Sequence, residues 1–334
     1  MKSNHKAQFL LLDATIIYGI TPIILDEVLD YLSPLHAIAI RFGIAVLVFL
    51  LILPFFNWKT GTSFLSCKTC IFIGWLNAFG FLTATIGQKM TTVGLATLVS
   101  SSFIFIVPFI AWKLENNPLD FKKIVVTTVA FFGIFLIGFD GDWTNFSSIS
   151  TIGIVFLLLA AIFWSFYIVI SGKFLNKSKS NDQEVNMLSF IFAILFHTFL
   201  PLFFLSIFTP IPPISLPSIV ILNLLFLGIF PTIIAFSLFC WAIARLGSVQ
   251  TSFYLFLQVI VPFLIETLFI GQYYSEWTYC GIFIILISMF WVCTRDMSSS
   301  QENKVKTFLR TPQRIVPPIF QPTICKMVRG RELM

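Results

Sequence analysis

Residues 106–110 read IVPFI and residues 260–264 read IVPFL, so one motif occurs twice in this chain. Two further matches keep the same order along the chain: GIFLI at 133–137 with GIFII at 281–285, and LLxAxIxY at 11–18 with LLxAxIxW at 157–164. The offsets between partners are 154, 148 and 146 residues. Self-similarity at a nearly constant offset indicates an internal repeat, so we expect two related halves.

The composition predicts the solvent in which both halves fold. Charged residues make up 11% of the 334 residues, whereas apolar residues make up 57% and Phe alone occurs 41 times. A soluble domain carries about 25% charged residues, because its surface must contact water. The chain is therefore predicted to fold in a lipid bilayer.

Ten apolar segments are long enough to be membrane helices. A helix needs about 20 mostly apolar residues to cross the hydrocarbon core, and lipid offers no partner for open backbone groups. The segments are residues 8–29, 34–56, 70–88, 91–113, 121–139, 151–171, 186–208, 218–244, 248–270 and 277–294. We therefore expect an all-α integral membrane protein with ten transmembrane helices.

Ten spans place both ends of the chain on one side of the membrane, and the basic residues indicate which side. With both termini in the cytoplasm, 19 of the 21 Lys and Arg residues fall on inner segments, leaving Lys89 outside and Arg41 within a span. We predict a multi-pass protein of the bacterial inner membrane with both termini cytoplasmic. Residues 295–334 carry eight basic and three acidic residues and form a basic cytoplasmic tail in this interpretation. Attraction to anionic lipids is one hypothesis for the tail, and a non-binding tail is the alternative.

Each half holds five spans, the first within residues 8–139 and the second within residues 151–294. Because five is an odd number, the second half enters the membrane upside down relative to the first. Inverted repeats recur in secondary transporters, where a central site opens alternately to the two sides. The arrangement therefore predicts a transporter with a small-molecule substrate bound between the halves. It leaves the oligomeric state open.

Several other classes of protein lack support in the sequence. No Gly-rich motif ending in Gly-Lys-Ser/Thr is present, so an ATP-driven motor is not indicated. The three His residues lie far apart, and six Cys residues form no disulfide framework. We expect no enzymatic activity, no metal and no cofactor. The net charge of +6 follows from the membrane topology, so no nucleic acid partner is expected. A non-transporting membrane scaffold is the alternative class.

Polar residues within two repeat-related spans are candidates for a substrate site. Gln250, Tyr254 and Gln258 follow one another at intervals of four residues, which is one face of a helix. Their counterparts 153 residues earlier include Thr97 and Ser101. Polar groups inside a span usually face the bundle or water, so we expect these residues to line a shared cavity. Hydrogen bonding between helices is the alternative.

Aromatic residues near the middle of two other spans are a second candidate. Tyr18 and Trp164 occupy equivalent places in the two halves, and Tyr167 lies one turn beyond Trp164. Aromatic rings can stack on a flat substrate or attract a cation. Packing in a Phe-rich core is equally compatible with the sequence.

Two charged residues lie within predicted spans and are candidates for a charge or coupling role. Asp13 lies close to Lys6, and we expect a shallow carboxylate paired with that lysine rather than a proton site. Arg41 lies about two turns inside the second span, where it can pair with an acidic residue or orient an anionic group. Of these alternatives we favour pairing. The acidic residues within expected reach are Asp26, Glu27 and Asp30.

Several short motifs resemble one membrane protein family. They are Tyr18-Gly19, Leu32-Ser33-Pro34, Arg41-Phe42, residues 161–165 (AIFWS) and residues 244–247 (ARLG). With them, each half resembles the five-helix EamA module of the drug/metabolite transporter superfamily, over residues 8–294. The chain departs from the family pattern where the usual Gly-Glu reads Gly271-Gln272 and where Asp26 stands in place of a basic residue.

The resemblance implies two inverted five-helix EamA-like repeats around a central cavity, with the fifth and tenth helices at the periphery. It also suggests a substrate, because the aromatic-rich interior is similar to that of the S-adenosylmethionine/S-adenosylhomocysteine exchangers of the superfamily. Exchange of these two compounds is therefore our first expectation. Export of amino acids or other metabolites, as in many members of the family, is the rival. No acidic residue stands at the middle of a span as an obvious proton carrier, which favours exchange over proton antiport.

Overall fold

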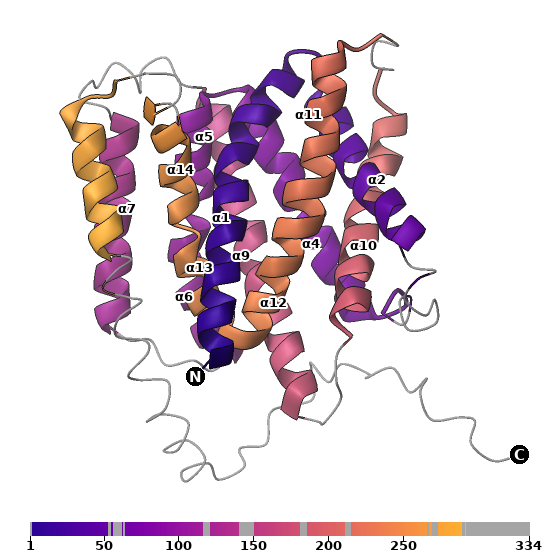
Figure 1. The fold of residues 1–334 in the computed structure, drawn as a ribbon, viewed down its shortest axis with the longest axis horizontal. Coiled ribbons are helices and arrows are strands. Elements are labelled where there is room, and N and C mark those ends of the chain that lie inside the picture. Colours follow the sequence, from indigo (N-terminus) through magenta and orange to yellow (C-terminus); the bar gives the residue numbers. More distant parts are fainter. Residues whose placement is uncertain are drawn as a thin grey trace, which may run out of the picture.

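The computed structural model describes residues 2–52, 55, 62, 64–115, 121–139, 150–180, 186–210, 215–265, 267–268, 273–288 and 291. Within these residues every regular element is a helix, as expected for an all-α membrane protein. The helices stand side by side in a bundle (Figure 1). The whole of the expected tail, residues 295–334, lies outside the described residues.

The first half contains α1 (Lys2–Leu29), α2 (Pro34–Ile52), α4 (Lys68–Lys89), α5 (Val93–Ser100), α6 (Phe103–Glu115) and α7 (Phe121–Phe139). The second half contains α9 (Thr151–Ser180), α10 (Met187–Ile207), α11 (Ser218–Ile229), η2 (Phe230–Ala235), α12 (Phe236–Leu246), α13 (Ser248–Tyr254), α14 (Leu257–Ile265) and a last helix, Glu276–Ser288. Among the described residues, seven helical segments are long and apolar enough to cross a membrane, and three shorter apolar helices accompany them. Each of these segments coincides with one of the ten expected spans.

Two of the expected continuous spans are interrupted, and at equivalent places. The fourth segment breaks at Ser101–Ser102 between α5 and α6, and the ninth breaks at residues 255–256 between α13 and α14. At each break the backbone makes tighter i→i+3 hydrogen bonds, from Ser102 N to Val99 O (3.1 Å) and from Phe256 N to Phe253 O (3.2 Å). The breaks are 154 residues apart, which is the offset of the repeated IVPF motif.

The repeated prolines give a physical reason for these interruptions. Proline has no N–H, so Pro108 and Pro262 leave the carbonyls of residues 104 and 258 without their usual helical partners. Both carbonyls lie in the first turn of the helix that follows the break. A weakened first turn next to i→i+3 bonds lets the chain change direction there.

A third irregularity lies in the eighth span, where a π-helix joins α11 to α12. Pro231 cannot donate to the carbonyl of Leu227, and the hydroxyl of Thr232 takes this acceptor instead, at 2.7 Å. The extra residue in this turn rotates Thr232 toward α2. The expected span 218–244 is therefore continuous but not a regular α-helix.

Small residues allow the helices to approach closely. A Cβ atom added at Gly74 of α4 would lie 2.5 Å from His197 Cβ of α10, and one at Gly19 of α1 would lie 2.5 Å from Val261 Cβ of α14. Thr198 Oγ1 donates to Gly74 O (3.1 Å) and accepts from Asn77 Nδ2 (3.1 Å) across the same α4–α10 contact. Close packing and such hydrogen bonds hold helices together where lipid removes the hydrophobic drive for association.

The fifth and tenth helical segments, α7 and Glu276–Ser288, stand together at one edge of the bundle (Figure 1). They meet through Gly133 and Gly281, because a Cβ at either position would collide with the carbonyl oxygen of the other. This matches the peripheral placement implied by the family resemblance. The helix surfaces around the bundle expose large apolar side chains, as a lipid-facing surface requires; examples are Phe204, Leu222 and Phe283.

Candidate functional site

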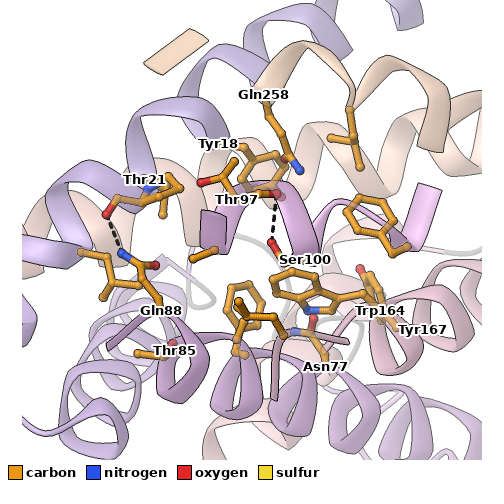
Figure 2. A pocket seen from close by; sticks show the side chains of 18 of the residues that line it. Tyr18, Thr21, Asn77, Thr85, Gln88, Thr97, Ser100, Trp164, Tyr167 and Gln258 are labelled. Carbon is orange, nitrogen blue, oxygen red and sulfur yellow. Dashed lines mark hydrogen bonds between the residues drawn. The ribbon is translucent and has the colours of Figure 1, made fainter. Parts of the chain in front are cut away.

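A cavity of about 140 Å³ lies between the two halves. Its walls come from α1, α2, α4, α5 and α6 of the first half and from α9, α12 and α14 of the second. Leu255, in the helix break between α13 and α14, also lines it. One water molecule needs roughly 10–15 Å³ of such space. The cavity is therefore large enough for a small organic molecule. Figure 2 shows side chains from both halves pointing into it.

Trp164 of α9 forms one wall of the cavity. Its indole meets the Phe81 ring edge-on at 5.2 Å between ring centres, and the Phe103 ring at 6.1 Å. The indole also lies directly against Gly80 of α4, where an added Cβ would stand 2.7 Å from both Cδ1 and Nε1 of Trp164. Glycine at this position therefore determines how deep the indole can sit.

Tyr18 and Tyr167 also line the cavity, so the structure brings all three expected aromatic residues together. Tyr18 meets the edge of Phe239 at 6.3 Å. Tyr167 stacks on Phe236 at 6.0 Å, and its hydroxyl lies 3.6 Å from Cys240 Sγ. These rings offer a mostly aromatic surface to whatever occupies the cavity.

The polar candidates are divided by the breaks in their helices. Thr97 and Gln258 line the cavity. Ser101 does not line it but accepts a hydrogen bond from Gln258 Nε2 at 3.4 Å. Gln250 and Tyr254 lie outside the lining, because the break after α13 ends the single helical face on which they were expected to continue to Gln258.

Five polar lining residues were not singled out from the sequence: Thr21, Asn77, Thr85, Gln88 and Ser100. Three of them share one face of α4, because residues 77, 81, 85 and 88 recur at helical spacing. Polar residues in an apolar span at this spacing were the available signal. Gln88 Nε2 also donates to the backbone oxygen of Pro22 at 2.8 Å and so ties α4 to α1 beside the cavity.

Arg41 of α2 is 1% exposed and lines the cavity. Its Nε donates to Thr232 Oγ1 of the π-helix at 2.7 Å, and its guanidinium carbon lies 4.9 Å from the centre of the Phe81 ring. The cavity lining, within the described residues, includes no Asp or Glu. Glu27, one of the expected partners, instead accepts a hydrogen bond from Asn223 Nδ2 at 2.7 Å. The favoured pairing of Arg41 with the acidic end of α1 is therefore replaced by contacts to a hydroxyl and an aromatic ring.

Asp13 lies on the exposed side of α1 and does not contribute to the cavity. The side chain of Lys6, its expected partner, is outside the described part of the chain. Among the described residues, no group of three or more His, Cys, Asp or Glu side chains is placed to hold a metal ion.

A cluster of contacts lies at the opposite end of the bundle from the ends of α1 and α4. Ser248 Oγ at the start of α13 donates to Glu115 Oε2 at the end of α6, at 2.8 Å. Gly172 of α9 packs against the same carboxylate, because an added Cβ there would lie 2.8 Å from Glu115 Oε1. Three elements that line or flank the cavity thus meet at one carboxylate.

Comparison with known proteins shows that both halves of the chain match the same protein family. The model of a family described as "EamA-like transporter family" matches residues 5–139 and 151–294. An "Uncharacterized transporter" of Archaeoglobus fulgidus is 26% identical over 281 residues, covering 84% of this chain and 83% of that protein. The "Uncharacterized transporter YdfC" of Bacillus subtilis is 23% identical over 199 residues, covering 58% of this chain and 60% of that protein.

A crystal structure with 17% sequence identity has a similar fold, with a TM-score of 0.65 over 85% of this chain and 96% of the other. At this identity the likeness concerns the fold alone.

Proposed function

The chain belongs to the EamA-like transporter family, and from this premise we propose that it is a secondary transporter that carries a small polar metabolite through the cavity between its halves. The observation that carries the proposal is the position of that cavity, which is lined by both repeats and flanked by their equivalent helix breaks. Family membership and transporter-named relatives indicate a transporter rather than an enzyme or a scaffold.

Alternating access provides the mechanism. Leu25 and Gln88 line the cavity and lie close to the ends of α1 and α4, on the face opposite the start of α1. On the other face, the contact of Ser248 with Glu115 joins the start of α13 to the end of α6. We therefore assign this conformation to a state open on the side away from the N-terminus. Bending at the two helix breaks would close that side and separate Glu115 from Ser248.

The membrane orientation follows from the distribution of charge. With 19 of 21 basic residues on one side in the predicted topology, both termini lie in the cytoplasm of a bacterium, and the open face is the periplasmic one. Reporter fusions at the two termini test this orientation. Termini on different faces would contradict both the orientation and the inverted repeat.

For the substrate we propose S-adenosylmethionine, taken up in exchange for S-adenosylhomocysteine. The aromatic wall of Trp164, Tyr18 and Phe81 suits a purine ring, and the amides of Asn77 and Gln258 suit its polar edge. The absence of Asp and Glu from the described lining favours exchange over proton coupling. The same absence also supports the rival, an exporter of amino acids or other metabolites, because the described lining offers no acidic group that could pair with the sulfonium of S-adenosylmethionine.

Purified protein in liposomes tests the proposal directly. Vesicles preloaded with S-adenosylhomocysteine should take up labelled S-adenosylmethionine faster than empty vesicles, and added external S-adenosylhomocysteine should slow the uptake. Uptake of amino acids without uptake of S-adenosylmethionine would favour the rival substrate class. Absence of transport across a metabolite panel by folded protein would contradict the proposal as a whole.

A further inference from the structure

We propose that Arg41 binds an acid group of the transported substrate, so that the substrate class is a carboxylate or a phosphate monoester. The inference rests on the proposed function, because it takes the cavity to be the transport site. It develops the alternative role given above for Arg41, orientation of an anionic group, in place of the favoured pairing with an acidic residue of α1.

The first argument is the burial of an uncompensated charge. Arg41 is 1% exposed and stands within α2, away from either end of the helix (Pro34–Ile52). A guanidinium remains charged in proteins, and a buried charge is normally paired with an opposite charge. The cavity lining, as far as the structure describes it, offers no carboxylate. A bound anion would supply the missing charge.

The second argument is the way in which the guanidinium is held. Nε donates to Thr232 Oγ1, and that hydroxyl in turn donates to Leu227 O, so the Nε side of the group is fixed by the π-helix. The guanidinium carbon lies over the ring of Phe81 at 4.9 Å. The Nη1 and Nη2 atoms are the pair that a guanidinium presents to a carboxylate or phosphate in a bidentate contact. A group anchored through Nε and a ring face is oriented before the ligand arrives.

The third argument is the charge of the cavity as a whole. Arg41 is the only charged residue in the lining that the structure describes, so the cavity is positive there. A positive cavity of low polarity attracts anions and disfavours cations that lack an acid group. The other lining groups are aromatic rings, hydroxyls and amides, which suit the uncharged remainder of a substrate. S-adenosylmethionine and amino acids both carry a carboxylate, so the inference applies to either candidate.

The experiment compares acids in proteoliposomes with derivatives that lack the acid group. The competitors are S-adenosylhomocysteine and its methyl ester, L-methionine and its methyl ester, and a phosphate monoester and its parent alcohol. Each is tested against uptake of whichever labelled compound the wild-type protein transports. We expect the acids to compete at least tenfold better than the esters and the alcohol that lack the acid group, and the acid that does so identifies a carboxylate or a phosphate as the bound group.

Variants assign the discrimination to one residue. Arg41→Gln should raise the KM for the acid at least tenfold and leave the KM for the ester nearly unchanged, whereas Arg41→Lys should retain part of the preference. Arg245→Gln is the matched control, because Arg245 stacks on Trp241 at 5.2 Å outside the cavity and its loss should preserve the preference. The comparison of acids and esters in wild-type protein stands even where Arg41→Gln fails to fold.

Two results would overturn the inference and leave transport intact. One is equal competition by acids and esters in the wild-type protein. The other is a folded Arg41→Gln variant that keeps the wild-type preference for acids. A wild-type protein that transports none of these compounds nor any of a broader metabolite panel contradicts the proposed function itself, and the inference falls with it.

Discussion

The contact between Gly80 and Trp164 allows a sharp test of the cavity wall. In a Gly80→Ala variant the new methyl group would lie 2.7 Å from two atoms of the indole, whereas ordinary contacts begin at 3.4 Å, so the ring must move by about 0.7 Å. Because Phe81 and Phe103 pack against the indole, we expect the ring to move toward the cavity that it lines. The variant therefore narrows the proposed binding site.

The expected energies follow from two opposing effects. Overpacking a well-packed site costs about 1–3 kcal/mol. Replacing Gly by Ala within a helix returns roughly 0.5–1 kcal/mol. We expect a net loss of stability between zero and about 2.5 kcal/mol. If the displaced indole also weakens the binding free energy of the substrate by about 1.4 kcal/mol, the affinity for the substrate falls tenfold.

The assay is the KM for uptake in proteoliposomes together with the melting temperature in detergent. Gly43→Ala is the matched control, since its added Cβ would lie 3.2 Å from the Phe199 ring, a milder approach at a residue outside the cavity. It should leave KM unchanged. A Gly80→Ala protein with wild-type KM would refute the placement of Trp164 as a wall of the binding site.

Three further outcomes are expected. Trp164→Ala should weaken substrate binding by about 1–3 kcal/mol. Trp75→Ala removes a half-exposed side chain outside the cavity and should leave binding unchanged. Equal KM values in the two variants would show that Trp164 only packs the bundle. A hydrogen bond from Cys70 lowers the pKa of the Cys67 thiol, so iodoacetamide should label Cys67 at neutral pH faster than an ordinary thiol and more slowly as the pH falls, while buried Cys70 stays unlabelled; mass spectrometry showing the reverse order would contradict this contact. Removal of residues 295–334 should spare transport, and complete loss of uptake by a correctly inserted truncated protein would disprove that expectation.

The helices themselves were predictable because membrane helices are decided by local properties. Length and apolarity suffice to mark a span where lipid cannot satisfy the backbone, and each of the ten expected segments corresponds to a helical segment in the structure. The helix breaks were not predicted, although both repeated prolines were visible. A proline shows where a backbone hydrogen bond is missing. Whether the helix kinks or breaks there depends on how the neighbouring helices pack around it.

The site was predictable in part for the same reason. Tyr18, Trp164 and Tyr167 were singled out by repeat position and depth, and all three line the cavity. Gln250 and Tyr254 were assigned by extending one helical face, and that face ends at the break after α13. A periodic pattern holds only as far as the helix is continuous.

By itself, the sequence determined an apolar, all-helical chain of two related halves and the charge asymmetry that orients it, because these depend on composition and on spacing along the chain. The tertiary structure alone decided the neighbours of Arg41. Its hydrogen-bond partner, Thr232, is 191 positions away in sequence and faces α2 because Pro231 opens a π-turn. Contacts of this kind depend on the rotation and approach of packed helices, which no local pattern encodes.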